Sequence, residues 1–78
     1  MPILQLMLVI FAEPFLPFVI YLADGRVLVV PHPEFIGLSG SKRAITVYHA
    51  NGDTEIVALS SVTSLRITAS QRENKPPI

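Results

Sequence analysis

Residues 18–30, FVIYLADGRVLVV, decide the fold of this chain. Two runs rich in β-branched and aromatic residues flank Asp24-Gly25, a combination typical of a β-hairpin with a two-residue type I′ turn. The register that follows pairs Leu22 with Val27 and Ile20 with Val29, and places them with Phe18 on one face. The opposite face carries Val19, Tyr21, Leu28 and Val30. Because both faces are mostly apolar, we expect both to be covered.

A second hairpin is predicted over residues 44–59, AITVYHANGDTEIVAL, with its turn at Asn51-Gly52. Its predicted register pairs Val47 with Ile56 and Ile45 with Ala58 on an apolar face. Thr46, Tyr48, Asp53 and Glu55 then form a solvent-facing side. Type I′ turns also predict positive φ angles at Gly25 and Gly52.

The remaining segments complete a mainly β pattern. Pro31 and Pro33 exclude a central strand at residues 31–33, so we expect the second strand to bend there and to resume over residues 35–38. A turn follows at residues 40–43. A last strand is predicted over residues 62–68, reached from residue 59 through a single 3₁₀ turn. Residues 69–78, SQRENKPPI after Ala69, predict a flexible tail.

The N-terminal segment, MPILQLMLVIFA, predicts a helix over about residues 2–12. Pro2 suits a first helical turn, and Pro14 ends the helix before Glu13. A secretory signal is disfavoured because no Lys or Arg precedes the apolar run, and Pro14 and Pro17 interrupt a membrane span. We therefore expect a cytoplasmic protein, with a membrane anchor as the weaker alternative. A helix that is apolar on every side predicts cover on every side.

Composition points to self-association. Only 15% of the 78 residues are charged, 50% are hydrophobic, and the mean hydropathy is +0.51. A single small domain, residues 1–68, buries too little surface to hide such a chain. We expect a homo-oligomer, with a further protein partner as an open alternative. The predicted interface residues are Leu4, Leu8, Phe11, Val19, Tyr21 and Leu28.

Composition also excludes several classes of protein. The absence of cysteine excludes a disulfide scaffold and a cysteine-based zinc site. A formal net charge of zero disfavours a nucleic-acid binder that relies on bulk positive charge.

The order of helix and strands predicts the fold class: an N-terminal α-helix followed by a five-stranded, strongly bent small barrel. This order resembles the Sm/LSm barrel, with a related SH3-like barrel as the near alternative. The resemblance to Sm proteins implies a ring, for which we expect five to seven subunits. It also implies RNA as an alternative partner.

A second resemblance covers about residues 13–67. The Pro-Phe-x-Pro-Phe entry at residue 14, the Leu-Ala-Asp-Gly-Arg turn, the Pro-His-Pro-Glu-Phe stretch and the closing Val-Thr-x-Leu segment resemble a group of short, uncharacterised bacterial proteins. That resemblance implies no activity. The chain departs from the group in its leading helix, where charges are expected and none occurs.

RNA binding would use two loops. Sm proteins contact RNA through the loop after the second strand and the loop before the last one. The corresponding candidates here are Lys42, Arg43, Ser60 and Ser61, although neither loop matches the Sm motifs. Two cations release few counterions, so a pair of solvated turns is the alternative interpretation.

Catalytic signals are sparse. His32 lies between two prolines and two residues before Glu34, which suggests a general base or metal ligand, but two side chains fall short of a ligand set. His49 is expected at the edge of the core. We therefore predict no enzyme, no metal and no cofactor. Three functions remain: a ring-forming scaffold or interaction module, an RNA-binding oligomer, and a membrane-associated protein held by residues 1–12.

Overall fold

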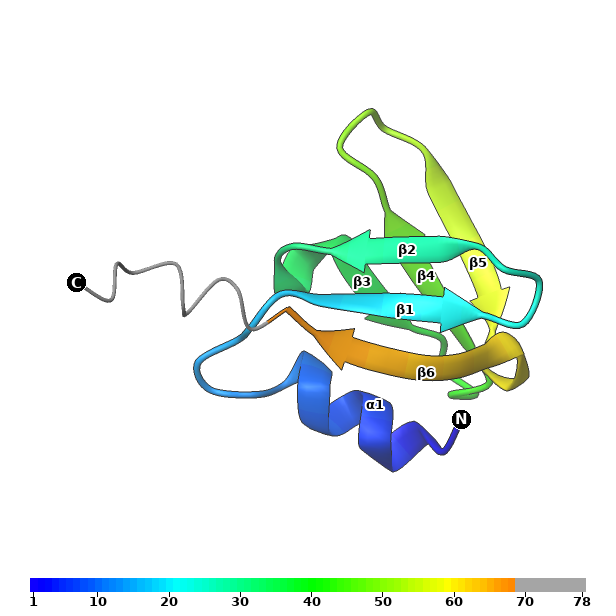
Figure 1. Cartoon of the computed structure of the whole chain (residues 1–78), viewed down its shortest axis with the longest axis horizontal. Coiled ribbons are helices and arrows are strands. Elements are labelled where there is room, and N and C mark those ends of the chain that lie inside the picture. Colours follow the sequence, from blue (N-terminus) through cyan, green and yellow to red (C-terminus); the bar gives the residue numbers. More distant parts are fainter. Residues whose placement is uncertain (69–78) are drawn as a thin grey trace.

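The computed structural model describes residues 1–68 and contains a helix and six antiparallel strands (Figure 1). The elements in chain order are α1 (Ile3–Ile10), β1 (Phe18–Leu22), β2 (Val27–Val30), the 3₁₀ helix η1 (Pro33–Phe35), β3 (Ile36–Leu38), β4 (Ala44–Tyr48), β5 (Thr54–Ala58), the 3₁₀ helix η2 (Leu59–Ser61) and β6 (Val62–Ile67). The predicted tail, residues 69–78, lies outside the described residues.

The strands form two three-stranded sheets, with strand orders β2-β1-β6 and β3-β4-β5. Figure 1 shows the second sheet behind the first, with its strands crossing those of the first, and α1 beside β6. The mainly β class, the N-terminal helix and the 3₁₀ turn before the last strand are confirmed. The sheets are not closed into a barrel, so the predicted five-stranded barrel is wrong in that respect.

The sixth strand arises at the prolines. The predicted bent second strand is divided into β2 and β3 by η1, which begins at Pro33. A proline has no N–H to donate to a strand ladder and suits the first turn of a helix, so the chain turns here instead of continuing as a strand.

Both hairpins have three-residue loops, which corrects the predicted registers. In the first hairpin the N–H of Leu22 donates to the carbonyl of Arg26 at 2.9 Å, and the N–H of Gly25 donates to the carbonyl of Leu22 at 3.0 Å. Gly25 has φ +93° as predicted, but Asp24 does not have the positive φ that a type I′ turn requires. The turn is therefore closed by a glycine bulge.

The extra loop residue exchanges the faces of β2. Ile20 pairs with Leu28, and Phe18 pairs with Val30, so these inward side chains meet in the core. Val27 and Val29 point outward and are 51% and 55% exposed. The predicted inward pair is thus on the outside, as expected for a register shift of one residue.

The second hairpin shows the same shift. The N–H of His49 donates to the backbone carbonyl of Asp53 at 2.8 Å, and Gly52 closes the loop with φ +98°. Val47 then lies opposite Glu55, and Ile45 lies opposite Val57. Glu55, predicted to face solvent, shares the inner side of the sheet with Val47, whereas Ile56 points outward and is 76% exposed.

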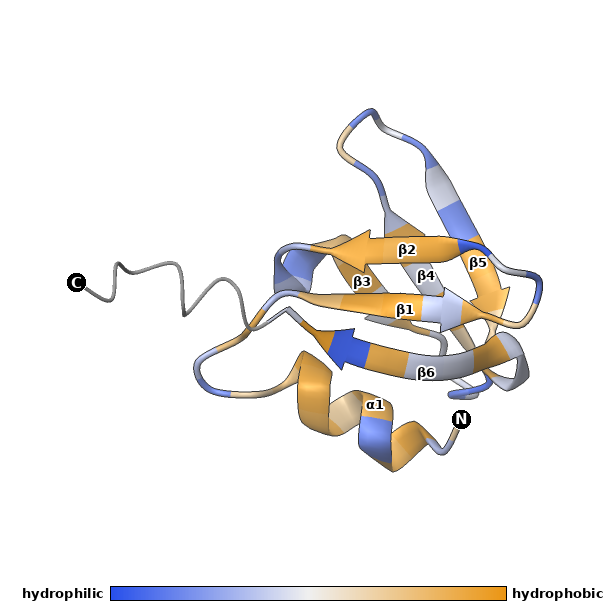
Figure 2. Ribbon diagram, viewed as in Figure 1, coloured by the Kyte–Doolittle hydropathy of each residue, from blue (hydrophilic) through white to orange (hydrophobic). Residues whose placement is uncertain are grey.

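The core lies between the sheets and is closed on one side by α1. Its buried residues are Leu6, Ile10, Phe18, Ile20, Leu22, Leu28, Val30, Ile36, Ile45, Val47, Val57, Leu59 and Val62. Helix α1 is shorter than the predicted 2–12 segment, and only Leu6 and Ile10 are buried on it. Apart from one hydrophilic band at Gln5, the helix is hydrophobic (Figure 2), and its exposed residues include Leu4 and Leu8. The expectation that the helix is covered on every side is therefore not met within one chain.

Candidate functional site

The first candidate site is the loop that carries Lys42 and Arg43. Its shape is fixed by a turn in which the N–H of Lys42 donates to the carbonyl of Ser39 at 3.0 Å. The Ser39 hydroxyl accepts from the N–H of Ala44 at 3.2 Å, and the Ser41 hydroxyl accepts from the N–H of Arg43 at 3.3 Å. Lys42 itself has φ +60° in the left-handed region. The two cations are thus presented by a loop whose serines support its backbone.

This loop meets the loop before β6. The N–H of Leu59 donates to the carbonyl of Arg43 at 2.8 Å, which joins the two segments. Lys42, Arg43 and Ser60 line one hollow of about 340 Å³, together with Met1 and Leu59. Three of the four predicted nucleic-acid contacts therefore lie together. Ser61 does not line this hollow, and its carbonyl accepts from the N–H of Ala23 at 2.8 Å.

The chemistry of this hollow suits an anion. Lys42 and Arg43 are exposed, and within residues 1–68 neither forms an ion pair. Two free cations and a serine hydroxyl are groups that bind phosphate oxygens.

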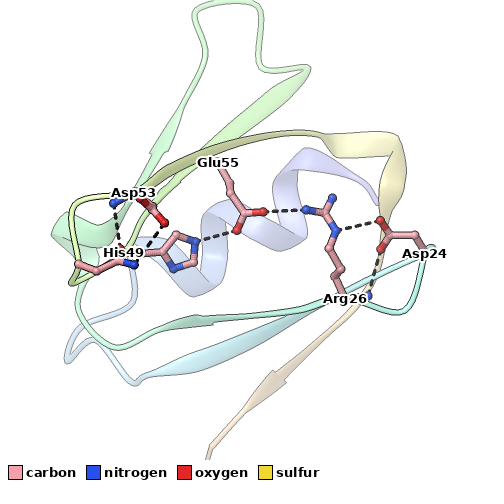
Figure 3. A network of polar contacts seen from close by, with 6 residues as sticks. Asp24, Arg26, His49, Asp53 and Glu55 are labelled. Atoms are coloured by element: carbon pink, nitrogen blue, oxygen red, sulfur yellow. Dashed lines mark hydrogen bonds and ion pairs between the residues drawn. The ribbon is translucent and has the colours of Figure 1, made fainter.

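A second polar arrangement links the two sheets (Figure 3). Arg26, which follows the first turn, donates from Nη1 to Glu55 Oε2 at 2.7 Å and from Nε to Asp24 Oδ2 at 2.8 Å. The other carboxylate oxygen of Glu55 lies 2.7 Å from Nε2 of His49. We call this chain of contacts the Glu55 network. It was not predicted from the sequence, because the predicted register placed Glu55 on the solvent-facing side.

The hydrogen bonds of the first turn change the pKa of Asp24. The backbone N–H of Arg26 donates to Oδ1 at 3.0 Å, and this bond, followed by the Arg26 side chain, lowers the pKa of Asp24 below its ordinary value. A lowered pKa stabilises the fold at pH values above the pKa of the unfolded chain, and the gain is lost as the pH falls through the folded value. Because Asp24 is exposed, solvent screens this contribution.

Both histidines lie at one pocket. His32 precedes η1 and Phe35 ends it, whereas Tyr48 ends β4 and His49 follows it. These four residues share the lining of a cavity of about 380 Å³. The His32 and Phe35 rings lie 5.9 Å apart between centroids. Within the described part of the chain, no three His, Asp or Glu side chains are grouped for a metal ion. Glu34 does not line this pocket.

The predicted interface residues divide into two groups. Leu4 and Leu8 on α1, and Phe11 directly after it, are 69%, 73% and 65% exposed. Val19 and Tyr21 are half-buried on the outer face of the first sheet. Leu28 is buried in the core, which corrects its predicted place on the outer face.

Helix α1 and strand β6 enclose a groove of about 410 Å³. Leu8, Val9, Leu65 and Ile67 contribute its apolar surface, and Gln5, Thr63 and Ser64 contribute polar groups. Strand β6 is an edge strand of its sheet, so this groove runs beside unpaired backbone groups.

No helix within residues 1–68 is long and apolar enough to cross a membrane. Comparisons of the chain with protein-family models, with curated proteins and with solved structures gave no match.

Proposed function

We propose that this chain is a non-enzymatic, self-assembling module, a cytoplasmic scaffold or interaction protein that forms rings of five to seven copies with an Sm-like strand order. Strand connectivity supports the Sm-like part. Because η1 joins β2 to β3 and η2 joins β5 to β6, the strands follow the order β6-β1-β2 and then β3-β4-β5. This is the order expected for the bent barrel that the sequence resembles.

Exposed apolar area is the observation that carries the proposal. Among residues 1–68, eight large hydrophobic side chains are exposed: Leu4, Leu8, Phe11, Val27, Val29, Tyr48, Ile56 and Ile67. Each Å² of apolar surface that association removes from water contributes about 25 cal/mol to the free energy of association. With only 15% charged residues, the chain has few groups to keep such a surface hydrated.

Unpaired strand edges provide a second kind of contact between copies, through backbone hydrogen bonds. Strands β5 and β6 are edge strands of different sheets, and each leaves one row of backbone groups unpaired in the single chain. Pairing β5 of one copy with β6 of the next would satisfy both rows, and Ile56 would approach the groove beside α1. A head-to-tail contact of this kind closes into a ring when its rotation allows.

Molar mass in solution tests the assembly. We expect light scattering after size exclusion, and native mass spectrometry, to give about five to seven times the 8.6 kDa of one chain. The mass should persist on dilution into the micromolar range. A monomer mass at all concentrations would contradict the proposal.

RNA binding is the second candidate function, and the shared hollow of Lys42, Arg43 and Ser60 favours it. We expect retention of single-stranded RNA to fall with salt, with a slope of about 0.7 per phosphate contacted. Replacing Lys42 and Arg43 with Ala should flatten that slope. Arg66→Ala, which removes an exposed cation from β6, is the matched control. Equal slopes for the double variant and the control would reject this function.

A further inference from the structure

The pocket that contains both histidines has a lining of unusual chemistry. Its volume is about 380 Å³, and it is formed by Val29, Pro31, His32, Phe35, Tyr48, His49 and Ala50. Of these described lining residues, none is Lys, Arg, Asp or Glu. The lining therefore combines apolar side chains with three residues that each carry a ring and a polar group, His32, Tyr48 and His49.

The rings come from separate elements and are open to a ligand. His32 is exposed and packs against Phe35 with 5.9 Å between the ring centroids and 44° between the planes. Tyr48 remains 44% exposed at the end of β4. Its hydroxyl lies 3.8 Å from the position that a Cβ on Gly37 would take, so the phenol lies close to the β3 backbone. Two aromatic surfaces thus border one space.

The His49 ring is held in place by the Glu55 network. Its Nε2 is engaged by Glu55 at 2.7 Å, and Glu55 is engaged by Arg26 at 2.7 Å on its other oxygen (Figure 3). Because a carboxylate only accepts hydrogen bonds, Nε2 of His49 is the donor in this contact, which holds the ring in one orientation. Glu55 therefore positions His49, and the orientation of the imidazole does not have to be acquired when a ligand binds.

The lining discriminates between classes of occupant. A hydrocarbon side chain would cover imidazole and phenol groups without satisfying their hydrogen bonds, which is costly. A phosphate or carboxylate would find no cation among the described lining residues. A neutral planar heterocycle has apolar faces to stack on rings and polar edges to pair with imidazole and hydroxyl groups.

We propose that this pocket binds a nucleobase, stacked against Tyr48 beside the His32–Phe35 pair and hydrogen-bonded at its edge to an imidazole. The base can come from a free nucleoside or from a single-stranded RNA, and the chemistry of recognition is the same for both. Every group involved belongs to one copy of the chain, so the site is complete in a monomer. In an assembly it requires that Tyr48 and Val29 remain accessible.

Histidine NMR signals give a direct test. The chain has two histidines, both in the pocket, so their imidazole ring protons report on it without assignment of other residues. We expect titration with adenosine or uridine, up to millimolar concentrations, to shift both sets of signals saturably. Ribose should leave them unchanged. Signals that do not shift with either nucleoside would overturn the proposal.

Variants separate stacking from a general effect on the fold. Tyr48→Leu should weaken nucleoside binding about fivefold or more, and Tyr48→Phe should retain most of it because the ring remains. Phe15→Leu is the matched control, since it removes a half-buried aromatic ring outside the pocket. Equal weakening by Phe15→Leu and Tyr48→Leu would overturn the proposal, provided that circular dichroism shows both variants folded.

Two further titrations show whether the base comes from RNA or from a free nucleoside, and whether a hydrocarbon side chain binds as well. Short single-stranded RNA that binds more tightly than the nucleoside and shifts the same histidine signals identifies an RNA base; a free nucleoside that binds as tightly as the RNA identifies the mononucleoside. N-acetylphenylalanine amide that binds as tightly as adenosine would show a site for hydrocarbon side chains and would contradict nucleobase recognition. Because nucleosides have no phosphate, the nucleoside titrations do not depend on Lys42 and Arg43, and a monomeric chain would leave them interpretable.

Discussion

Gly25 and Gly52 occupy equivalent places in the two hairpins. Each donates its N–H to the carbonyl three residues earlier, and each has a φ angle near +95°, at 93° and 98°. The residue before each glycine, Asp24 or Asn51, accepts a hydrogen bond from the backbone N–H two residues farther along. The Asx side chain and the glycine therefore build the turn together, which is the usual role of this pair of residue types.

Substitution of Gly52 isolates the backbone part of this design. A Cβ on Gly52 would meet no atom within 4 Å, so Gly52→Val should lose stability only through the positive φ. We expect a loss of about 1–2 kcal/mol in urea unfolding, because a β-branched residue is strained there. Gly40→Val is the control, since Gly40 has equally open space and no positive φ. Equal losses at the two positions would mean that the φ angle of Gly52 does not control the stability of the hairpin.

At the scale of elements, the sequence predicts which segments form strands better than how those strands pair. Asp-Gly and Asn-Gly mark the turns correctly, but the same dipeptides occur both in two-residue loops and in three-residue loops closed by a glycine bulge. One added loop residue moves Val27 and Ile56 outward and moves Glu55 to the inner side. The Glu55 network was therefore beyond reach of the pattern alone.

Helix α1 shows a related limit. Its uniform hydrophobicity predicts burial without saying what covers each side. The structure buries Leu6 and Ile10 on the core and leaves Leu8 exposed. Periodicity could not separate these faces, because no polar stripe marks the outer one.

At the scale of the whole molecule, the two sheets are held together by more than their core. The Arg26–Glu55 ion pair joins the first turn to β5, and the bond from Leu59 to Arg43 joins the start of β4 to the segment after β5. Such long-range contacts decide which loops become neighbours. The resemblance to Sm proteins pointed to Lys42 and Ser60. Nothing in the sequence indicated that His32 and His49 share one pocket.

The outer face of α1 provides the last prediction, which concerns the assembly. Leu8 is 73% exposed in the single chain, whereas Leu6 is fully buried. If copies cover the outer face of α1, Leu8→Asp places an unpaired charge in a dry contact and should dissociate the oligomer to 8.6 kDa chains that remain folded. Leu6→Asp places the same charge in the core of one chain and should unfold it.

Light scattering and far-UV circular dichroism together separate these two outcomes. Loss of mass with retained β signal for Leu8→Asp, and loss of both for Leu6→Asp, would assign Leu8 to an interface and Leu6 to the fold. An assembly of unchanged mass in Leu8→Asp would remove α1 from the interface, because a buried charge without a partner is too costly to leave the association intact. The contact would then have to involve the strand edges and Ile56 without the helix.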